Sequence, residues 1–274
     1  MKPVFANSAW VSAPEWAILR KGRLQRRMLQ VRYGFFVHPA AGPVLIDTGY
    51  TEHSLTVAGR PTALRCYARM LAPQLVVQEQ AEPFLAHFGL TPLDISRVIV
   101  THFHGDHVSG LASFPNARFI VSGSAWTRVQ RNSNFQNLRH GVFTKLLPEN
   151  FGDRLVVIEE TAFRTSAHFP VGHDLFGDGS VLAVPLPGHA DGHFGVLFDK
   201  LETPLLYATD TQWISEALAP KSRSQILPRL ISDKFKDVAS SSDLVFGFSQ
   251  AGGTVILCHD DAPSPFDYAQ GAVL

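Results

Sequence analysis

The sequence predicts an α/β fold in which two β-sheets pack face to face and helices cover their outer sides. Three observations favour this arrangement. Short β-branched or apolar runs alternate with helical stretches, and this order recurs in both halves of the chain, as expected for packed layers. Hydrophobic residues make up 45% and charged residues 18% of the 274 residues, which is enough apolar material for a large core. We therefore expect a single domain over residues 1–274.

The first half is expected to begin with a β-hairpin over residues 33–38 and 44–47, two apolar runs joined by a turn rich in Pro and Ala. Residues 51–92 read as mostly helical material that prolines divide into short pieces. The elements expected next are a strand over 97–100, a strand over 117–121, and a helix from Ala125 capped by Ser124.

The second half repeats this outline. Its expected elements are strands over 180–184, 194–198, 205–208 and 254–258, and a helix over 224–235. Residues 1–30 fit none of these patterns, and we expect them to form an N-terminal extension. Residues 132–180 break the rhythm of strands and helices, apart from one strand over 155–158. We predict that this region is an insertion over the functional site, serving as a lid or as a dimer arm.

Composition limits the partners that we expect. The formal net charge is zero, so the chain as a whole has no pull toward nucleic acid or anionic membranes. No apolar stretch approaches about 18 residues, so no transmembrane helix is expected. Two cysteines, Cys66 and Cys258, cannot form a disulfide framework, which indicates a reducing compartment such as the cytoplasm. Residues 20–27 carry five positive charges in eight positions; we interpret them as a solvated edge strand or loop, with contact to an anionic substrate or RNA as the alternative.

One short stretch concentrates residues that can bind metal. Directly after the predicted strand over 97–100, three histidines and one aspartate occupy the sequence Thr-His-Phe-His-Gly-Asp-His. If the strand continues into this stretch, His102 and His104 point to the same side, because side chains alternate along a strand. Asp106 and His107 then follow around the turn. A lone histidine is usually structural, but four ligand-type side chains within six positions indicate a metal site.

The motif His-x-His-x-Asp-His resembles the signature of the metallo-β-lactamase superfamily, and matches downstream extend the resemblance over residues 33–265. The resemblance implies a four-layer αββα sandwich with two mixed β-sheets. It also implies two divalent metal ions, with zinc as the first choice and Fe, Mn or Co as alternatives. It assigns His102, His104 and His189 to the first metal, Asp106, His107 and His259 to the second, and Asp210 to the bridge between them.

Such a metal pair supports hydrolysis. Two ions that share a carboxylate can also share a hydroxide, because together they lower the pKa of the bound water toward about 7. The resemblance implies that this metal-bridging hydroxide attacks the carbonyl of a lactone or related ester. Asp106 and Asp210 are the implied catalytic residues, and Asp106 could pass a proton to the leaving group. Because position 104 is His and not Glu, the ligand set argues against the redox di-iron branch.

Three further residues lie close to this ligand set in the sequence. Asp47, at the end of a predicted strand, could accept the free N–H of a ligand histidine and fix its tautomer; a simple turn aspartate is the alternative. His193 matches a family histidine that is not a ligand, and we assign it to structure. Cys258 adjoins His259, but on a strand it should face the other way and belong to the core.

Among the branches of the superfamily, the chain resembles the N-acyl homoserine lactonases, which act in quorum quenching. Lactonases typically place a tyrosine three residues after the bridging aspartate, whereas this chain has Trp213, a bulkier donor. Phe103 would suit an apolar acyl pocket. The alternatives are a glyoxalase II-like thioester hydrolase, a ribonuclease Z-like nuclease and a non-catalytic metal-binding sensor. The expected partner is a small ester or lactone, without membrane or nucleic acid, and a homodimer is left open.

Overall fold

The computed structural model describes residues 1–56, 73–160, 162–224 and 226–269. Within these ranges the strands form two sheets, one of seven strands in the order β4-β1-β2-β3-β5-β6-β7 and one of six in the order β13-β12-β11-β10-β9-β8. The strands are β1 Val4–Pro14, β2 Arg26–His38, β3 Gly42–Ile46, β4 Gln74–Leu75, β5 Arg97–Ile99, β6 Arg118–Val121, β7 Leu155–Val157, β8 Ala162–Arg164, β9 Gly172–Asp174, β10 Leu182–Pro185, β11 Phe194–Phe198, β12 Leu205–Thr209 and β13 Thr254–Leu257.

Most helices of the described ranges are short. The α-helices are α1 Glu15–Ile18, α2 Glu52–Thr56, α4 Ala81–Ala86, α5 Gly105–Val108, α6 Gly123–Arg131, α7 Asn134–Arg139, α8 Ile226–Ile231 and α9 Phe235–Gln250. Single 3₁₀ turns are η1 Val77–Glu79, η2 Pro92–Asp94, η3 Leu111–Ser113, η4 Thr144–Leu146, η5 Phe151–Arg154, η6 Ile158–Glu160 and η7 Ser215–Leu218. Among these described helices, none has the length and apolar character needed to cross a bilayer.

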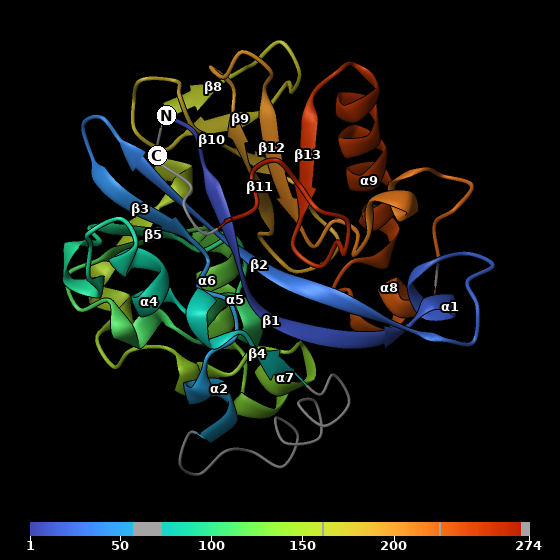
Figure 1. Ribbon diagram of the computed structural model, residues 1–274, viewed down its shortest axis with the longest axis horizontal. Coiled ribbons are helices and arrows are strands. Elements are labelled where there is room, and N and C mark those ends of the chain that lie inside the picture. Colours follow the sequence, from blue (N-terminus) through green and yellow to red (C-terminus); the bar gives the residue numbers. More distant parts are fainter. Residues whose placement is uncertain (57–72, 161, 225, 270–274) are drawn as a thin grey trace.

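Three apolar clusters show that the chain folds as a four-layer αββα sandwich. The cluster between the sheets joins Val31 and Phe36 of the large sheet to Val196 and Tyr207 of the small one. A second cluster packs the outer face of the large sheet against α4 and α6, and a third packs the outer face of the small sheet against α9. In Figure 1, α9 lies beside β13 and α4 lies at the opposite side of the molecule. The predicted fold class is confirmed.

The candidate ligands follow strands that end at one edge of this sandwich. The strands β3, β5, β6 and β7 run parallel, as do β12 and β13, and sites in such sheets form where parallel strands end. Asp47 directly follows β3, and Thr209 ends β12 just before Asp210. Both Asp47 and Thr209 have positive φ angles, 59° and 47°, so the chain turns sharply at these two strand ends.

Several elements differ from the sequence-based expectation. The helix predicted over 224–235 corresponds to the shorter α8, and the long helix α9, which begins at Phe235, was not predicted. Helix α9 contains three consecutive serines and Gly247, which have weak helix propensity. Packing against the small sheet stabilises α9 instead, and its buried Ser241 and Ser242 donate hydrogen bonds to the carbonyls of Pro187 and Val238. Helix α6 begins earlier than expected, with Ser122 as its cap. Residues 57–72 of the predicted helical stretch lie outside the described residues.

Residues 1–30, for which we expect an extension, supply β1 and the first part of β2. Strand β1 lies between β2 and β4 in the large sheet, so this segment is integrated into the fold. Its strand pattern is obscured in the sequence by Asn7 and Ser8, which are buried polar residues at an irregularity in the β1–β2 register. The Asn7 side chain accepts a hydrogen bond from the amide of Val31, and the Ser8 hydroxyl donates to the Val31 carbonyl.

The region 132–180 contributes α7 and three strands. Strand β7 lies at one edge of the large sheet, and β8 and β9 lie at one edge of the small sheet. The predicted strand over 155–158 is β7. Residues from Leu138 to Phe143 line a cavity beside the candidate ligands described below.

Arg32 ties β2 to the segment that follows β13. Its guanidinium, buried from solvent, forms an ion pair with Asp267 at 2.7 Å and donates to the carbonyls of Asp260 and Ala262. This segment also carries His259. The arginine therefore fixes part of the site as well as part of the fold.

We predict that Arg32→Met lowers the free energy of unfolding by about 3–5 kcal/mol, because removal of one partner leaves a charge and several carbonyls without their donor. Urea unfolding of the purified protein measures this change. Arg118→Met is the matched control: Arg118 is exposed and donates one hydrogen bond, to Leu155, so about 0.5 kcal/mol or less is expected. Equal losses for the two variants would contradict the prediction.

Candidate metal centre

Seven buried side chains from four loops converge at the edge of the sandwich where the strands end. The loop after β5 supplies four of them, and the loops after β10, β12 and β13 supply one each. Two clusters of potential ligand atoms result, each with all its atoms within 4.8 Å of one another: His102, His104, His189 and Asp210 form one, and Asp106, His107, Cys258 and His259 form the other. The structure therefore brings together every residue for which the sequence predicts a metal-binding role.

Three imidazoles of the first cluster point their ring nitrogens at one another. His104 Nδ1 lies 3.1 Å from His102 Nε2 and 2.9 Å from His189 Nε2. A neutral imidazole has one N–H and one lone pair, so a ring of three facing nitrogens leaves lone pairs directed at a common point. Imidazole nitrogens grouped in this way are a donor set that suits a divalent transition metal.

Asp210 connects the two clusters through one oxygen atom. Its Oδ2 lies 3.2 Å from His189 Nε2 and 3.8 Å from His102 Nε2 in the first cluster. The same atom lies 3.5 Å from both His107 Nε2 and His259 Nε2 in the second cluster. Asp210 thus faces the imidazoles of both clusters with a single carboxylate oxygen.

The second cluster combines one further carboxylate with two imidazoles. Asp106 Oδ2 lies 3.3 Å from His259 Nε2 and 3.7 Å from His107 Nε2. Cys258 belongs to the core between the sheets, as predicted, but its sulfur also lies within reach of this cluster, although we expected it to face away. Strand β13 ends at Leu257, so strict alternation no longer applies at Cys258, and its sulfur lies 3.5 Å from the Arg32 carbonyl.

Contacts on the far side of each ring fix the tautomers in the second cluster. His107 Nδ1 lies 2.8 Å from Asp47 Oδ2, and Asp47 also accepts hydrogen bonds from the amide and hydroxyl of Thr101. His259 Nδ1 donates to the Gln30 carbonyl at 2.9 Å. Both rings therefore turn Nε2 toward the cluster, which is the usual arrangement for a metal-binding imidazole.

His193 lies behind the first cluster. One ring nitrogen lies 2.7 Å from the Leu186 carbonyl, and the other contacts the Thr209 hydroxyl. Both nitrogens are thus already in use. This arrangement agrees with the structural role that we predict for His193.

The electrostatics of the two clusters differ. Burial, together with the neighbouring imidazoles, lowers the pKa of His104 to about 4 and that of His102 well below its ordinary value. These rings are therefore neutral and can offer lone pairs. Burial alone would lower the pKa of His107 as well, but the carboxylates of Asp47, Asp106 and Asp210 outweigh burial and raise it.

The residues fit a pair of bound cations. Burial opposes the ionised form of Asp210, yet the facing imidazoles of His259 and His107 hold its pKa well below the ordinary value. Two buried atoms, His107 Nε2 and Asp210 Oδ1, make no hydrogen bond, and buried polar atoms normally have partners. Ligands to a cation must be deprotonated, and here the cation would replace the positive charge of protonated imidazoles. The two clusters fit a dinuclear metal site.

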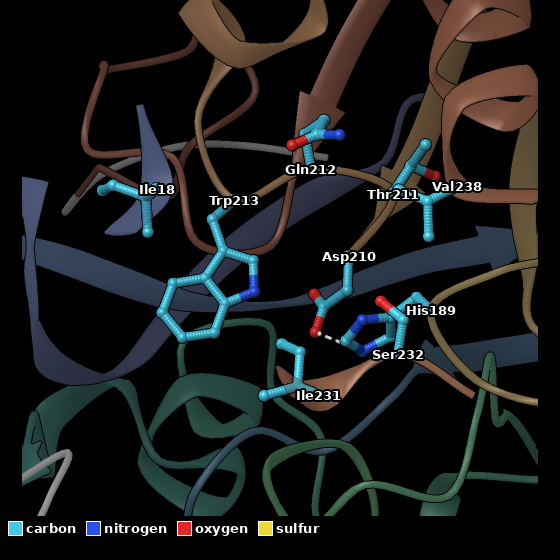
Figure 2. Close-up of a pocket in the computed structure, with 9 residues that line it drawn as sticks. All are labelled: Ile18, His189, Asp210, Thr211, Gln212, Trp213, Ile231, Ser232 and Val238. Atoms are coloured by element: carbon cyan, nitrogen blue, oxygen red, sulfur yellow. Dashed lines mark ion pairs between the residues drawn. The ribbon is translucent and has the colours of Figure 1, made fainter. Parts of the chain in front are cut away.

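A cavity of about 350 Å³ opens beside the candidate ligands. Most of its other lining is apolar and comes from three parts of the chain: Leu138 and Phe143, Trp213, and Leu230 and Ile231. Arg139 and His140 are the polar members of this lining. Figure 2 shows a smaller adjoining pocket, in which Trp213 and Ile231 lie around Asp210 and His189. The predicted pocket residue Trp213 therefore lies next to the candidate ligands.

Phe103, unlike Trp213, lies outside the cavity at the candidate ligands and lines a separate pocket beside Val129 and Ala190. The ring is buried and packs against Trp126 and Phe151 in the outer cluster of the large sheet. Phe103 is absent from the lining of the cavity at the candidate ligands. The cause is the alternation along the extended chain: His102 and His104 turn toward the site, so the residue between them turns away.

Sequence reasoning missed two contributors. The Gln30 carbonyl that orients His259 has no side-chain signal, so no sequence pattern could reveal it. Gly141 lies against the His104 ring: a Cβ at this position would lie 3.1 Å from His104 Cδ2, and φ is +71°. A glycine in a loop is the only available signal, and it is weak.

Comparison with known proteins gives one family match. The model of the metallo-beta-lactamase superfamily matches residues 29–222. The probable metallo-hydrolase Rv2300c of Mycobacterium tuberculosis is 28% identical over 183 residues, which are 62% of this chain and 53% of that protein. The N-acyl homoserine lactonase AttM of Azorhizobium caulinodans is 27% identical over 185 residues, 67% of this chain and 65% of that protein. The chain thus spans about half the length of the first of these relatives.

Solved structures share the fold at lower identity. An AiiA mutant of B. thuringiensis with bound N-decanoyl-L-homoserine superimposes with a TM-score of 0.70 at 16% identity, covering 95% of this chain and 93% of that chain. The dizinc quorum-quenching lactonase AidC, in complex with a product, gives 0.62 at 12% identity, covering 95% and 88%.

We predict that Asp47→Asn weakens metal binding about 10- to 100-fold. The reason is that the imidazole of His107 loses the carboxylate that accepts from its Nδ1 and fixes its orientation. Competition with a chelator of known affinity measures this change. Asp94→Asn, which alters an exposed aspartate whose carboxylate accepts a hydrogen bond from the Thr91 amide, serves as the control. Metal affinity equal to that of the unaltered protein would show that Asp47 is only a turn residue.

Proposed function

This chain belongs to the metallo-β-lactamase superfamily, and from that premise we propose that it is a metal-dependent hydrolase acting on a lactone or a related carboxylic ester. The observation that carries this proposal is the position of Asp210 Oδ2, which faces four imidazole nitrogens of two ligand clusters at 3.2–3.8 Å. Hydrolysis by two metals needs two ions about 3.5–4 Å apart, and a carboxylate that faces both ligand clusters can hold them so. Lactonases among the relatives and fold neighbours support the choice of substrate.

The proposed roles of the residues follow from their positions. His102, His104 and His189 hold one ion, Asp106, His107 and His259 hold the other, and Asp210 serves both. When bound, two divalent cations supply a water of lowered pKa and a Lewis acid for the carbonyl oxygen. We propose zinc, the ion for which mixed imidazole and carboxylate ligands are commonest.

Asp106 is the proposed proton donor to the leaving group. Its carboxylate lines the cavity and faces His259 at 3.3 Å, so one oxygen can contact a ligand imidazole while the other faces the substrate. Opening of a lactone or ester leaves an alkoxide, which must take up a proton. Asp106, ionised as a ligand, would first take up the proton that the attacking water releases and then pass it to the alkoxide.

Trp213 is the proposed substrate-orienting donor. Its side chain is largely buried, its ring lies 4.8 Å from the His259 ring, and its Nε1 has no hydrogen-bond partner. Figure 2 shows the nitrogen-bearing edge of the indole turned toward Asp210. A buried N–H without a partner is costly, and an acceptor on the substrate would satisfy it. The carbonyl oxygen of an ester or lactone is such an acceptor.

The apolar lining favours a substrate with an acyl chain or another apolar group. Leu138, Phe143, Leu230 and Ile231 offer no charge to the substrate, and an apolar wall with few polar groups is typical of small-molecule sites. Within the lactones, we propose N-acyl homoserine lactones as the substrate. This substrate would give the protein a role in quorum quenching. The cytoplasmic location and the homodimer stay predictions.

We predict that the purified zinc-loaded protein hydrolyses a panel of γ- and δ-lactones and p-nitrophenyl esters, and that Asp210→Asn lowers kcat by at least about 100-fold. Removal of metal with a chelator should abolish turnover, and added Zn²⁺ should restore it. Ester hydrolysis is followed by absorbance and lactone opening by proton release. Asp174→Asn, which alters a buried aspartate on β9 away from the site, is the control.

Two outcomes would redirect the proposal. Faster turnover of S-acyl glutathione thioesters than of any lactone would identify a thioester hydrolase of the glyoxalase II kind. Tight binding of two metal ions without turnover of lactones, esters or thioesters would favour the non-catalytic sensor. Fewer than one bound ion per chain would refute the metal-dependent mechanism itself.

We predict that Trp213→Phe lowers kcat/KM toward lactones by up to about 100-fold, because the ring stays but the N–H donor is lost. Trp213→Tyr keeps a donor and should retain more activity than Trp213→Phe. Steady-state kinetics of the three proteins on one lactone measure the order. Equal activity of the Phe and Tyr variants would mean that the indole only fills space.

A further inference from the structure

Behind the first ligand cluster lies a group of charged side chains that the proposed function does not use. We name it the charge cluster; it consists of Arg128, His140, Asp191, Asp233 and Lys234. The positive charges of Arg128 and Lys234 balance the negative charges of the two aspartates. Asp233 and Asp191 are largely buried, with side-chain exposures of 7% and 22%. Such a group is expensive to bury unless every charge has a partner, so its position calls for an explanation.

Each charged side chain of the charge cluster forms an ion pair within it. Arg128 forms ion pairs with Asp191 and, at 3.4 Å, with Asp233. Asp233 also contacts His140 Nδ1, and Lys234 lies 3.0 Å from Asp191. Arg128 Nη2 lies 3.4 Å from His140 Nε2, so the guanidinium, the imidazole and the Asp233 carboxylate form one chain of contacts.

One end of the charge cluster holds the loop that carries His189. The amide of Asp191 donates to Asp233 Oδ2 at 2.8 Å, and the amide of Asp233 donates to the His189 carbonyl at 3.1 Å. The amide of Lys234 donates to the Gly188 carbonyl at 3.0 Å. Residues 188–191 are therefore fixed on both sides of the candidate ligand.

The other end of the charge cluster holds the chain segment that packs against the His104 ring. His140 precedes Gly141, whose Cα approaches the His104 ring so closely that a Cβ would lie 3.1 Å from its Cδ2. The next residue, Val142, forms a β-bridge with His104. The same segment lines the substrate cavity. Two of the three imidazoles of the first ligand cluster thus depend on contacts that the charge cluster fixes.

The second ligand cluster is held in a different way. His107 is oriented by Asp47, and His259 by the Gln30 carbonyl. No contact described above joins the charge cluster to either of these residues. The side-chain supports of the two candidate metal positions therefore differ, while the main chain joins them through the His107 amide, which donates to the His104 carbonyl at 3.0 Å.

We propose that Arg128, Asp233 and His140 are positioning residues for the first metal position only, and that they set its affinity independently of the second. The proposal rests on the metal-holding role proposed above, but not on the identity of the substrate. Loss of the charge cluster should convert the chain from one that binds two ions tightly to one that binds one tightly and one weakly.

The test isolates each metal position. His259→Ala removes a ligand of the second position, and His189→Ala removes a ligand of the first. Asp233→Asn, which keeps the shape but neutralises the charge, is then added to each background. Zn²⁺ dissociation constants are measured by competition with a chromophoric chelator, and bound zinc per chain is measured by elemental analysis.

In the His259→Ala background we expect Asp233→Asn to raise the Zn²⁺ dissociation constant about 10- to 100-fold. In the His189→Ala background the change should be less than about threefold. Arg128→Gln should reproduce the pattern, which guards against a folding defect peculiar to Asp233→Asn. Asp174→Asn removes the ion pair of a buried aspartate with Arg164 elsewhere, so it should lower thermal stability without changing either constant.

Equal weakening in both backgrounds would show that the charge cluster only stabilises the fold, and no change in the His259→Ala background would show that it does not reach the metal; either result overturns the proposal. Absence of bound zinc from the unaltered protein would refute the metal centre as well. Two tight ions with the predicted selective loss, but no turnover of any ester, would uphold this proposal and refute only the hydrolase.

Discussion

The central constraint on this molecule is electrostatic: five imidazoles and two carboxylates point inward at one place, away from water. Such a set is stable only if something compensates its lone pairs and charges. The protein meets part of this demand with hydrogen bonds to the outer edges of the rings, as between Asp47 and His107. The inner edges are left facing one another, and for these a cation is the natural complement.

The sandwich architecture makes this convergence achievable. Each sheet contributes strands that end at the same edge, so residues far apart in the sequence meet without long excursions of the chain. Asp47 and Thr209 adopt positive φ values where the chain leaves β3 and β12. A strained backbone at such positions is characteristic of functional sites, where the surrounding structure holds it in place. Arg32 then fixes the segment after β13, which brings His259 into the same space.

The local parts of the site were predictable from sequence and the distant supports were not. The stretch from His102 to His107 carries its own signature because four ligand-type residues fall within one turn of chain. Phe103 lies in the outer cluster of the large sheet because side chains alternate along the extended chain between His102 and His104. The serine-rich helix α9 and the strand β1 were missed because packing partners elsewhere in the chain decide their conformation. Main-chain contacts such as the Gln30 carbonyl leave no trace in residue identities.

One part of the cavity wall lies on a segment that carries none of the candidate ligands. Leu230 belongs to α8, a helix of six residues, and its side chain is 77% exposed at the mouth of the cavity. None of the seven candidate ligands lies on that helix. Substitutions along α8 can therefore change which molecules fit the cavity without altering any of the candidate metal ligands. One ancestral scaffold can in this way diversify its substrates by altering a single short helix.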